Sequence, residues 1–354
     1  MGWNSWNCWG LSVNDEKVRD AARMMNEKLH AYGWEYVNID DGWEAAARTK
    51  QGEILSNDKF PDFKALTDYI HGLGLKFGIY SSPGHITCGG HVGSYQHEEI
   101  DARTWERWGV DYLKYDYCGY LDIEKDSKEE TIQEPYIVMR NALDKVKRDI
   151  VFCVGYGAPN VWNWAAEAGG NQWRTTRDIT DEWNVVTAIG TFQDVCADAT
   201  APGRNNDPDM LVVGKLGQGW GSKVHDSYLT ADEQYSHISL WCILSAPLLI
   251  GCDMANMDDF TLNLLTNNEV IAVSQDPMVA PARKMLVKNG QIWSKKLYDG
   301  SYAVGFFHVD PYFILWDQDD AESMQMRDYE FDFDLNLLGI EGKAMVRDLW
   351  RQKD

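Results

Sequence analysis

Short apolar runs and longer amphipathic stretches alternate along the chain from its first residues to about residue 275. The apolar runs have the length of buried strands, and the stretches between them have the spacing of helices with one apolar face. This alternation is typical of a parallel sheet covered by helices, because parallel strands need a crossover connection. Strands are predicted at the opening GWNSW and at 36–40, 76–81, 112–117, 151–156, 173–178, 209–213 and 248–253.

Two of the predicted helices carry clear start signals. Asn14 is an N-cap residue for a helix over 14–30, and Thr230 with Glu233 forms a capping box for a helix over 230–245. Eight strand–helix units predict an α/β fold of the (β/α)8 TIM-barrel type rather than an open doubly wound sheet. A glycine-rich phosphate loop does not follow the first strand, which argues against a nucleotide-binding fold.

The pattern changes at Asp276-Pro277. Beyond it, QIWSKKL, DGSYAVGFFHV and YFILWD have the character of strands separated by Asp-Gly and Asp-Pro turns. We therefore predict a catalytic barrel over 1–277 and a small C-terminal antiparallel β-sandwich domain over 281–354. No closing strand is visible before Asp354, so the second domain is expected to be incomplete as it stands.

The composition limits the partners that the chain can have. With 33 basic and 55 acidic residues, its formal net charge of −22 repels phosphate backbones and anionic lipid surfaces. We expect a neutral substrate, no nucleic acid and no membrane insertion, and we leave a homo-oligomer open. Apolar runs of 18 residues are absent, and the opening MGWNSWNCWG reads as mature sequence from which a leader can have been removed.

Aromatic residues and cysteines add two further indications. The 16 Trp and 17 Tyr offer flat faces for a sugar ring, although most are expected in the core. The seven cysteines include no CxxC pair, so neither a zinc ribbon nor a redox motif is indicated. Their odd number leaves at least one free thiol.

Carboxylates gather at the ends of the predicted strands. Asp40-Asp41, Asp116 and Asp178 end three of them, and Asp209 opens another within NDPD. Catalytic groups of TIM barrels lie at the carboxyl ends of the strands. Because a buried carboxylate is costly unless it is paired, five of them at one mouth favour a functional site over ordinary helix caps.

The period of two along a strand pairs each candidate carboxylate with a cation. Lys114 shares a face with Asp116, and Arg174 shares a face with Asp178. A nearby ammonium favours the ionised form that a nucleophile needs. A general acid must instead hold a proton, so we expect Arg174 mainly to bind sugar hydroxyls and burial to keep Asp178 protonated once substrate excludes water. The alternative is two ordinary ion pairs that close the barrel.

Metal and cofactor binding is not indicated. His85, His91 and His97 recur every six residues, a spacing that suits neither a helix face nor a strand face. The acidic triplet of NDPD lacks the rest of a calcium loop. We expect loop histidines, no metal and no cofactor.

The motifs resemble those of glycoside hydrolase family 27, the α-galactosidase and α-N-acetylgalactosaminidase family. They occur in family order over about 275 residues: MGWNSW, NIDDGW, GIYSSPG with TCGG, HEEIDARTWERWGVDYLKYDYC, WRTTRDI, NDPDML, APLLIGCD and NNEVIAVSQDP. The resemblance implies a retaining exo-acting α-galactosidase that forms a covalent glycosyl-enzyme, with its two carboxyl groups about 5–5.5 Å apart.

The resemblance also implies roles for individual residues. Asp116 matches the family nucleophile and Asp178 the acid/base. The pair Asp40 and Asp41 matches the ligands of the sugar 4- and 6-hydroxyls. Cys88 and Cys118 match a disulfide, which favours a secreted or periplasmic location. The other matched pocket positions are Trp6, Tyr80, Cys88, Lys114, Arg174 and Asp209.

One departure concerns the sugar C2 position. Many family members have Cys-Glu-Trp after the fifth strand, whereas this chain has Cys153-Val154-Gly155-Tyr156-Gly157. Val154 cannot accept the hydrogen bond that the Glu would, so N-acetylgalactosamine and β-L-arabinopyranose remain alternative sugars, the latter disfavoured by the intact Asp40-Asp41. More distant alternatives are a non-catalytic carbohydrate-binding protein and a metal-dependent hydrolase.

Overall fold

The structure, a computed structural model, describes residues 1–354 except 127, 288–289 and 309–329. Its centre is one sheet of parallel strands in the order β10-β1-β2-β3-β4-β5-β6-β7. The strands are β1 (Gly2–Asn4), β2 (Tyr36–Asn38), β3 (Lys76–Ser81), β4 (Tyr112–Tyr115), β5 (Val151–Val154), β6 (Gln172–Arg174), β7 (Asn205–Asp207) and β10 (Leu249–Ile250).

The two edges of this sheet approach each other. Strand β10 pairs with β1, with Gly2 opposite Leu249, and a single parallel bridge joins Leu211 to Ile250. The segment after β7 therefore lies beside β10, which is the connection that closes a barrel. The predicted TIM-barrel fold is confirmed.

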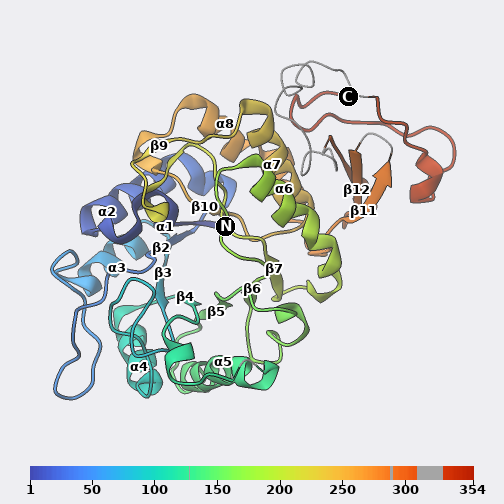
Figure 1. The fold of residues 1–354 in the computed structure, drawn as a ribbon. Coiled ribbons are helices and arrows are strands. Elements are labelled where there is room, and N and C mark those ends of the chain that lie inside the picture. Colours follow the sequence, from blue (N-terminus) through green and yellow to red (C-terminus); the bar gives the residue numbers. More distant parts are fainter. Residues whose placement is uncertain (127, 288–289, 309–329) are drawn as a thin grey trace, which may run out of the picture.

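Helices surround the strands, as Figure 1 shows. Asn14 caps α2 through the Lys17 amide, and Thr230 forms the predicted capping box with Glu233. The predicted helix over 14–30 changes to a π-helical segment at Met25–Leu29. The α-helices are α1 (Trp6–Trp9), α2 (Asp15–Met24), α3 (Phe63–Gly72), α4 (Glu98–Trp108), α5 (Glu129–Leu143), α6 (Trp183–Phe192), α7 (Ala231–Ile243), α8 (Asp259–Thr266) and α9 (Asn268–Ser274).

Two strand predictions were wrong in position. The seventh strand is Asn205–Asp207 rather than 209–213, because Pro208 follows it and Asp209 has a left-handed backbone with φ of 79°. The sixth strand ends at Arg174, so Asp178 lies in the loop beyond it rather than on its face. The sixth strand was predicted to continue into the loop after Arg174, whereas the seventh was assigned to the apolar run 209–213 and is in fact the polar segment before it.

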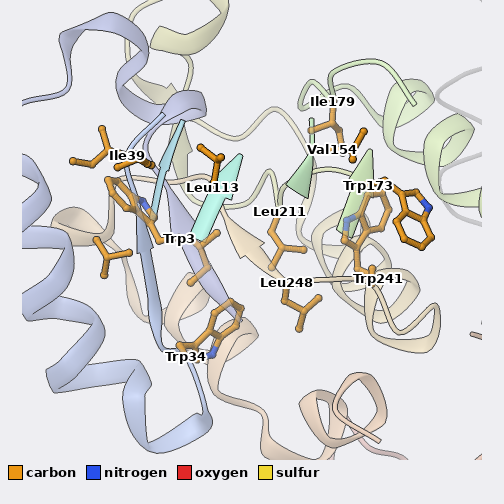
Figure 2. Packing of buried hydrophobic residues seen from close by; sticks show 14 of the residues in the cluster. Trp3, Trp34, Ile39, Leu113, Val154, Trp173, Ile179, Leu211, Trp241 and Leu248 are labelled. Carbon is orange, nitrogen blue, oxygen red and sulfur yellow. The ribbon is translucent and has the colours of Figure 1, made fainter. Parts of the chain in front are cut away.

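Tryptophans make up much of the barrel core (Figure 2). Trp3, Trp34, Trp173 and Trp241 are at most 1% exposed. Their indole N–H groups each find an acceptor, such as the Cys252 carbonyl for Trp3 at 2.8 Å. Because a buried N–H without a partner is costly, these bonds let large rings fill the space between strands and helices.

The C-terminal part contains an antiparallel sheet of β11 (Arg283–Val287), β12 (Gly290–Lys296) and β13 (Tyr302–Phe307), as predicted for the segment after Pro277. The predicted strand YFILWD lies outside the described residues. A further small sheet pairs β8 (Lys215–Leu216) with β9 (His225–Asp226). Within the described parts of the chain, no helix is long and apolar enough to span a membrane.

Candidate active site

Asp116 lies immediately after β4, where the strand opens into the mouth of the barrel. Its Oδ2 accepts a hydrogen bond from the Tyr80 hydroxyl at 2.9 Å, and its Oδ1 accepts one from the Tyr117 amide at 2.8 Å. Burial raises the pKa of Asp116 above its usual value, although Lys114 and these two donors act in the opposite direction. Burial also raises the pKa of Tyr80 well above normal, so its hydroxyl stays a donor.

Asp40 follows β2 and pairs with a cation from the next strand but one. The Lys114 Nζ lies 2.8 Å from Asp40 Oδ2, and the Asn4 side-chain amide donates to the same oxygen at 2.8 Å. Burial acts to lower the pKa of Lys114, but Asp40 and Asp116 outweigh it and keep the ammonium charged. The expected charge effect of Lys114 on Asp116 is present, but its direct partner is Asp40.

Asp41 is held by the hairpin that follows β3. Its Oδ1 accepts from the Thr87 hydroxyl at 2.9 Å and lies 3.1 Å from His91 Nδ1, while its Oδ2 accepts from the Gly89 amide at 2.6 Å. Burial raises the pKa of Asp41 despite these bonds. The carboxylate is therefore fixed in orientation at the end of β2.

Arg174 ends β6 and lies between two carboxylates. One guanidinium nitrogen is 3.0 Å from Asp178 Oδ1 and 3.0 Å from Asp209 Oδ2. The Arg174 and Asp209 side chains are each 5% exposed, whereas that of Asp178 is 80% exposed. Although solvent reaches most of the Asp178 side chain, partial desolvation by the surrounding protein acts to raise its pKa, and the charges of Arg174 and Lys114 outweigh this and lower the pKa overall.

That burial keeps Asp178 protonated once substrate excludes water stays a prediction, and in the free protein Arg174 and Lys114 lower the pKa of Asp178. Arg174 pairs with Asp178 directly, because the loop after β6 turns back and brings the two residues together. The charge of Asp178 in turn acts to raise the pKa of Asp116, so the two carboxylates interact across the mouth.

The remaining predicted residues complete the rim. Cys88 and Cys118 form the expected disulfide, with their Cα atoms 5.1 Å apart, and the Cys88 sulfur lies 3.7 Å from Asp116 Oδ2. The five other cysteines are free and buried. Trp6 lies in α1, and its amide donates to Asn4 Oδ1 at 2.8 Å, which links it to Asp40 through Asn4.

At the end of the fifth strand, where the sequence departs from the family motif, the residue that faces the barrel interior is Gly155 rather than Val154. Cys153 interacts electrostatically with Lys114 and Arg174, so it faces the barrel interior. Val154 points the other way and belongs to the apolar core. Since side chains alternate along a strand, Gly155 is the next inward position. A Cβ there would lie 3.4 Å from the Asp116 Cα, beside the candidate nucleophile.

Several residues that position the site were not assigned to it from the sequence, and His91 was expected to be a loop histidine. Asn4 contacts Asp40, while Thr87 and His91 contact Asp41. Asp207 accepts from the Asp209 amide at 2.8 Å, and burial raises the pKa of Asp207 to about 6. Only Asp207 had a visible signal, its place in NDPD. The others are common residue types whose contacts depend on loop geometry.

Comparisons with known proteins identify the family. A family model described as alpha galactosidase A matches residues 7–276, and one for the alpha galactosidase C-terminal beta sandwich domain matches residues 288–354. The chain belongs to the α-galactosidase family. An α-galactosidase of Cyamopsis tetragonoloba is 40% identical over 360 residues, which cover 99% of this chain and 79% of that protein. Curated α-galactosidases of this similarity support the same activity for the chain, a glycoside hydrolase.

Solved structures of the α-galactosidase family share the fold. A Bacteroides fragilis structure described as an α-galactosidase/melibiase is 39% identical with a TM-score of 0.80, and the alignment covers 86% of this chain and 66% of that one. A β-L-arabinopyranosidase from Geobacillus stearothermophilus has a TM-score of 0.83 at 26% identity, over 100% of this chain and 90% of the other. The family therefore includes more than one sugar specificity on one barrel.

Proposed function

We propose that the chain hydrolyses terminal α-D-galactosyl residues of oligosaccharides or glycoconjugates by a retaining double displacement, with Asp116 as nucleophile and Asp178 as acid/base. The observation that carries the proposal is the pair of carboxylates at one mouth in different surroundings. Asp116 is held by Tyr80 and the Tyr117 amide, whereas Asp178 is open to solvent beside Arg174. Two carboxyl groups in contrasting environments are what a glycosidase needs for its separate roles.

The reaction has two balanced steps. Asp116 attacks the anomeric carbon while the bond to the leaving oxygen breaks, and that oxygen takes the proton of Asp178. Water then gives a proton to Asp178 and attacks the same carbon, which releases Asp116 and the sugar. The proton that Asp178 needs is disfavoured by Arg174 in the free enzyme. Substrate that draws the guanidinium toward sugar hydroxyls, and excludes water, would restore it.

Recognition of the galacto configuration is assigned to Asp40 and Asp41. Both are buried carboxylates, and each is already fixed by donors from neighbouring strands and loops. A fixed acceptor loses little entropy when it binds a sugar hydroxyl. A sugar of the opposite ring configuration would place its hydroxyl elsewhere and leave the carboxylate without that hydrogen bond. Trp6, Tyr80, Cys88, Lys114, Arg174 and Asp209 are assigned to the walls of the same pocket.

The missing acceptor at the fifth strand supports a second sugar, N-acetylgalactosamine. Gly155 has no side chain and so offers no acceptor beside Asp116, and a Cβ there would lie 3.0 Å from the Tyr115 carbonyl oxygen. A 2-acetamido group needs space at C2 rather than an acceptor. For β-L-arabinopyranosides, which lack C6, the similar Geobacillus fold is the supporting observation, and the intact Asp40-Asp41 pair argues against them.

The location follows from the disulfide. Bonds such as Cys88–Cys118 persist in oxidising compartments, which supports a secreted or periplasmic enzyme. Light scattering would measure whether the chain forms a homo-oligomer.

The test compares two carboxylate variants on p-nitrophenyl α-galactoside. D116A should lose a factor on the order of 10⁴ or more in kcat, and D178A about 10²- to 10⁴-fold. With added azide, D178A should form the α-galactosyl azide and D116A the β anomer, because only the former retains the covalent route. D122A, which changes an exposed aspartate near β4, is the matched control. Full activity of D116A, or reversed azide products, would contradict the assignment.

The sugar is tested with aryl glycosides that differ at C2 and C6. A kcat/KM highest for the α-galactoside supports the first proposal, and one highest for the 2-acetamido sugar supports the second.

A further inference from the structure

Three potential ligand groups meet behind the pocket wall that Asp41 forms. Asp41 and Glu44 follow β2, and His91 comes from the hairpin after β3. One ligand atom of each lies within 4.8 Å of the others. The Asp41 and Glu44 residues are 1% and 0% exposed, and the His91 side chain is 23% exposed. This places two carboxylates and one imidazole at a position with limited access from solvent.

Glu44 has an unsatisfied oxygen at this position. Its Oε2 accepts the Gly42 amide at 3.1 Å, but its buried Oε1 has no hydrogen-bond partner among the described residues. Lys59 lies nearby, but its Nζ donates to the Leu11 carbonyl at 2.6 Å. Because a buried carboxylate oxygen without a partner is expensive, Glu44 Oε1 would be stabilised by a cation bound at this position.

The donor set suits one class of ligand. Imidazole nitrogen with carboxylate oxygens is a common zinc donor set, with metal–ligand distances of about 2.0–2.2 Å. The 3.1 Å between His91 Nδ1 and Asp41 Oδ1 is compatible with two ligands of one such ion. Glu44 Oε1 would be the third ligand and would gain the partner that it lacks.

The surroundings hold these ligands in place. The Thr87 hydroxyl donates to Asp41 Oδ1 at 2.9 Å and accepts the His91 amide at 3.1 Å. The hairpin is closed by the hydrogen bond from the Thr87 amide to the His91 carbonyl and is tied to β4 through Cys88–Cys118. Hydrogen bonds to metal ligands orient the ligands and account for a large part of the affinity for the metal ion.

We propose that Asp41, Glu44 and His91 bind a divalent transition-metal ion, with Zn²⁺ the best match, and that this ion inhibits the enzyme by competing with sugar for Asp41. The site is regulatory or inhibitory rather than catalytic, since the reaction proposed above runs through Asp116 and Asp178. The competition rests on the proposed role of Asp41 in sugar binding, whereas the metal site itself does not.

The metal site is tested without sugar by calorimetric titration of ZnCl₂ into untagged, chelator-free protein. One ion should bind per chain. Loss of a residue that only orients a ligand weakens metal affinity about 10- to 100-fold, so E44Q and H91A should each lose at least about tenfold. H85A is the matched control, because His85 lies in the same hairpin and packs edge-on against Tyr95. Thermal melts show whether each variant is folded. If E44Q does not fold, the zinc affinity of H91A alone decides the test.

Competition is tested by repeating the titration with galactose. Linkage requires galactose to weaken zinc binding by the same factor by which zinc weakens galactose binding. Absence of zinc binding, or unchanged binding in both variants, overturns the site. Zinc binding that galactose does not affect overturns the inhibitory role. Wild-type protein that binds zinc but hydrolyses no galactoside would contradict the proposed function and leave the metal site standing.

Discussion

A guanidinium nitrogen of Arg174 lies 3.0 Å from a carboxylate oxygen of Asp178, the proposed proton donor. The same nitrogen is equally close to the buried Asp209, which keeps the guanidinium in the pocket wall. The proposed acid thus has its pKa lowered in the free enzyme, while burial raises that of Asp116. The proposed reaction needs the opposite arrangement, with Asp116 ionised and Asp178 protonated.

Replacing Arg174 by Met should move the basic limb of the pH profile of kcat/KM to higher pH. The positive charge of Arg174 favours the ionised form of Asp178, so its loss raises the pKa of this proposed acid. R174K is the matched variant, since it keeps a charge but cannot contact two carboxylates in the same way. Its basic limb should stay close to that of wild type. Equal shifts in both variants would show that charge is not the cause.

Replacing Tyr80 by Phe should move the acid limb of the kcat/KM profile upward. The Tyr80 hydroxyl donates to Asp116 and acts to lower its pKa, and a nucleophile is inactive below its pKa. A hydrogen bond to a charged group is worth about 1.5–3 kcal/mol, and one pKa unit is about 1.4 kcal/mol, so we expect a shift of about one unit. Y69F, on α3, controls for loss of a hydroxyl elsewhere. An unchanged acid limb would mean that the Tyr80 hydroxyl does not affect the pKa of Asp116.

Replacing Lys114 by Met should destabilise the fold. The Asp40 side chain is 3% exposed and would lose its only cation within ion-pair distance among the described residues. Breaking a buried ion pair from one side costs about 3–5 kcal/mol, because the other charge stays behind. Urea unfolding measures the loss. The double variant K114M/D40N also removes the Asp40 charge, so it should recover part of the lost free energy of unfolding. If nothing is recovered, the loss in K114M comes from packing instead.

The fold could be predicted from the sequence because its strands are apolar runs of the right length. Tyr36, Lys76, Tyr112 and Val151 begin strands where the pattern predicted them. The errors lie at the carboxyl ends. There the apolar run gives way to loops whose path depends on local backbone conformation, such as the left-handed φ of Asp209.

The sequence predicted that the site residues come together at one end of the barrel, but it predicted their contacts only in part. Periodicity along one strand indicates which side chains share a face, so Lys114 and Asp116 were correctly associated. It does not indicate which neighbour on another strand a long side chain reaches, and Lys114 reaches Asp40. For the same reason Gly155, rather than Val154, faces Asp116. The contacts of His91 depend on a hairpin that no short pattern describes.

Lys295 provides a test of how the C-terminal sheet is attached to the barrel. It is 5% exposed in β12, and its Nζ donates to the Ser245 hydroxyl at 2.7 Å and to the Val273 carbonyl at 2.6 Å. Burial lowers the pKa of Lys295 to about 8 from an ordinary value of 10.5. The ammonium is therefore bound to partners, but its charge is disfavoured in the folded state.

The sign of the resulting pH dependence is fixed. Between about pH 8 and the unfolded value of 10.5, the unfolded chain binds more protons at Lys295 than the folded chain. Stability therefore rises with pH in this window, by up to about 1.4 kcal/mol per pH unit from this residue. K295M should lack that contribution, so its stability relative to wild type should fall as pH rises from 8 to 10. Urea unfolding of wild type, K295M and the exposed-site control K296M measures the free energy of unfolding at each pH. Parallel curves of this free energy against pH for all three proteins would mean that the pKa of Lys295 is not lowered by burial.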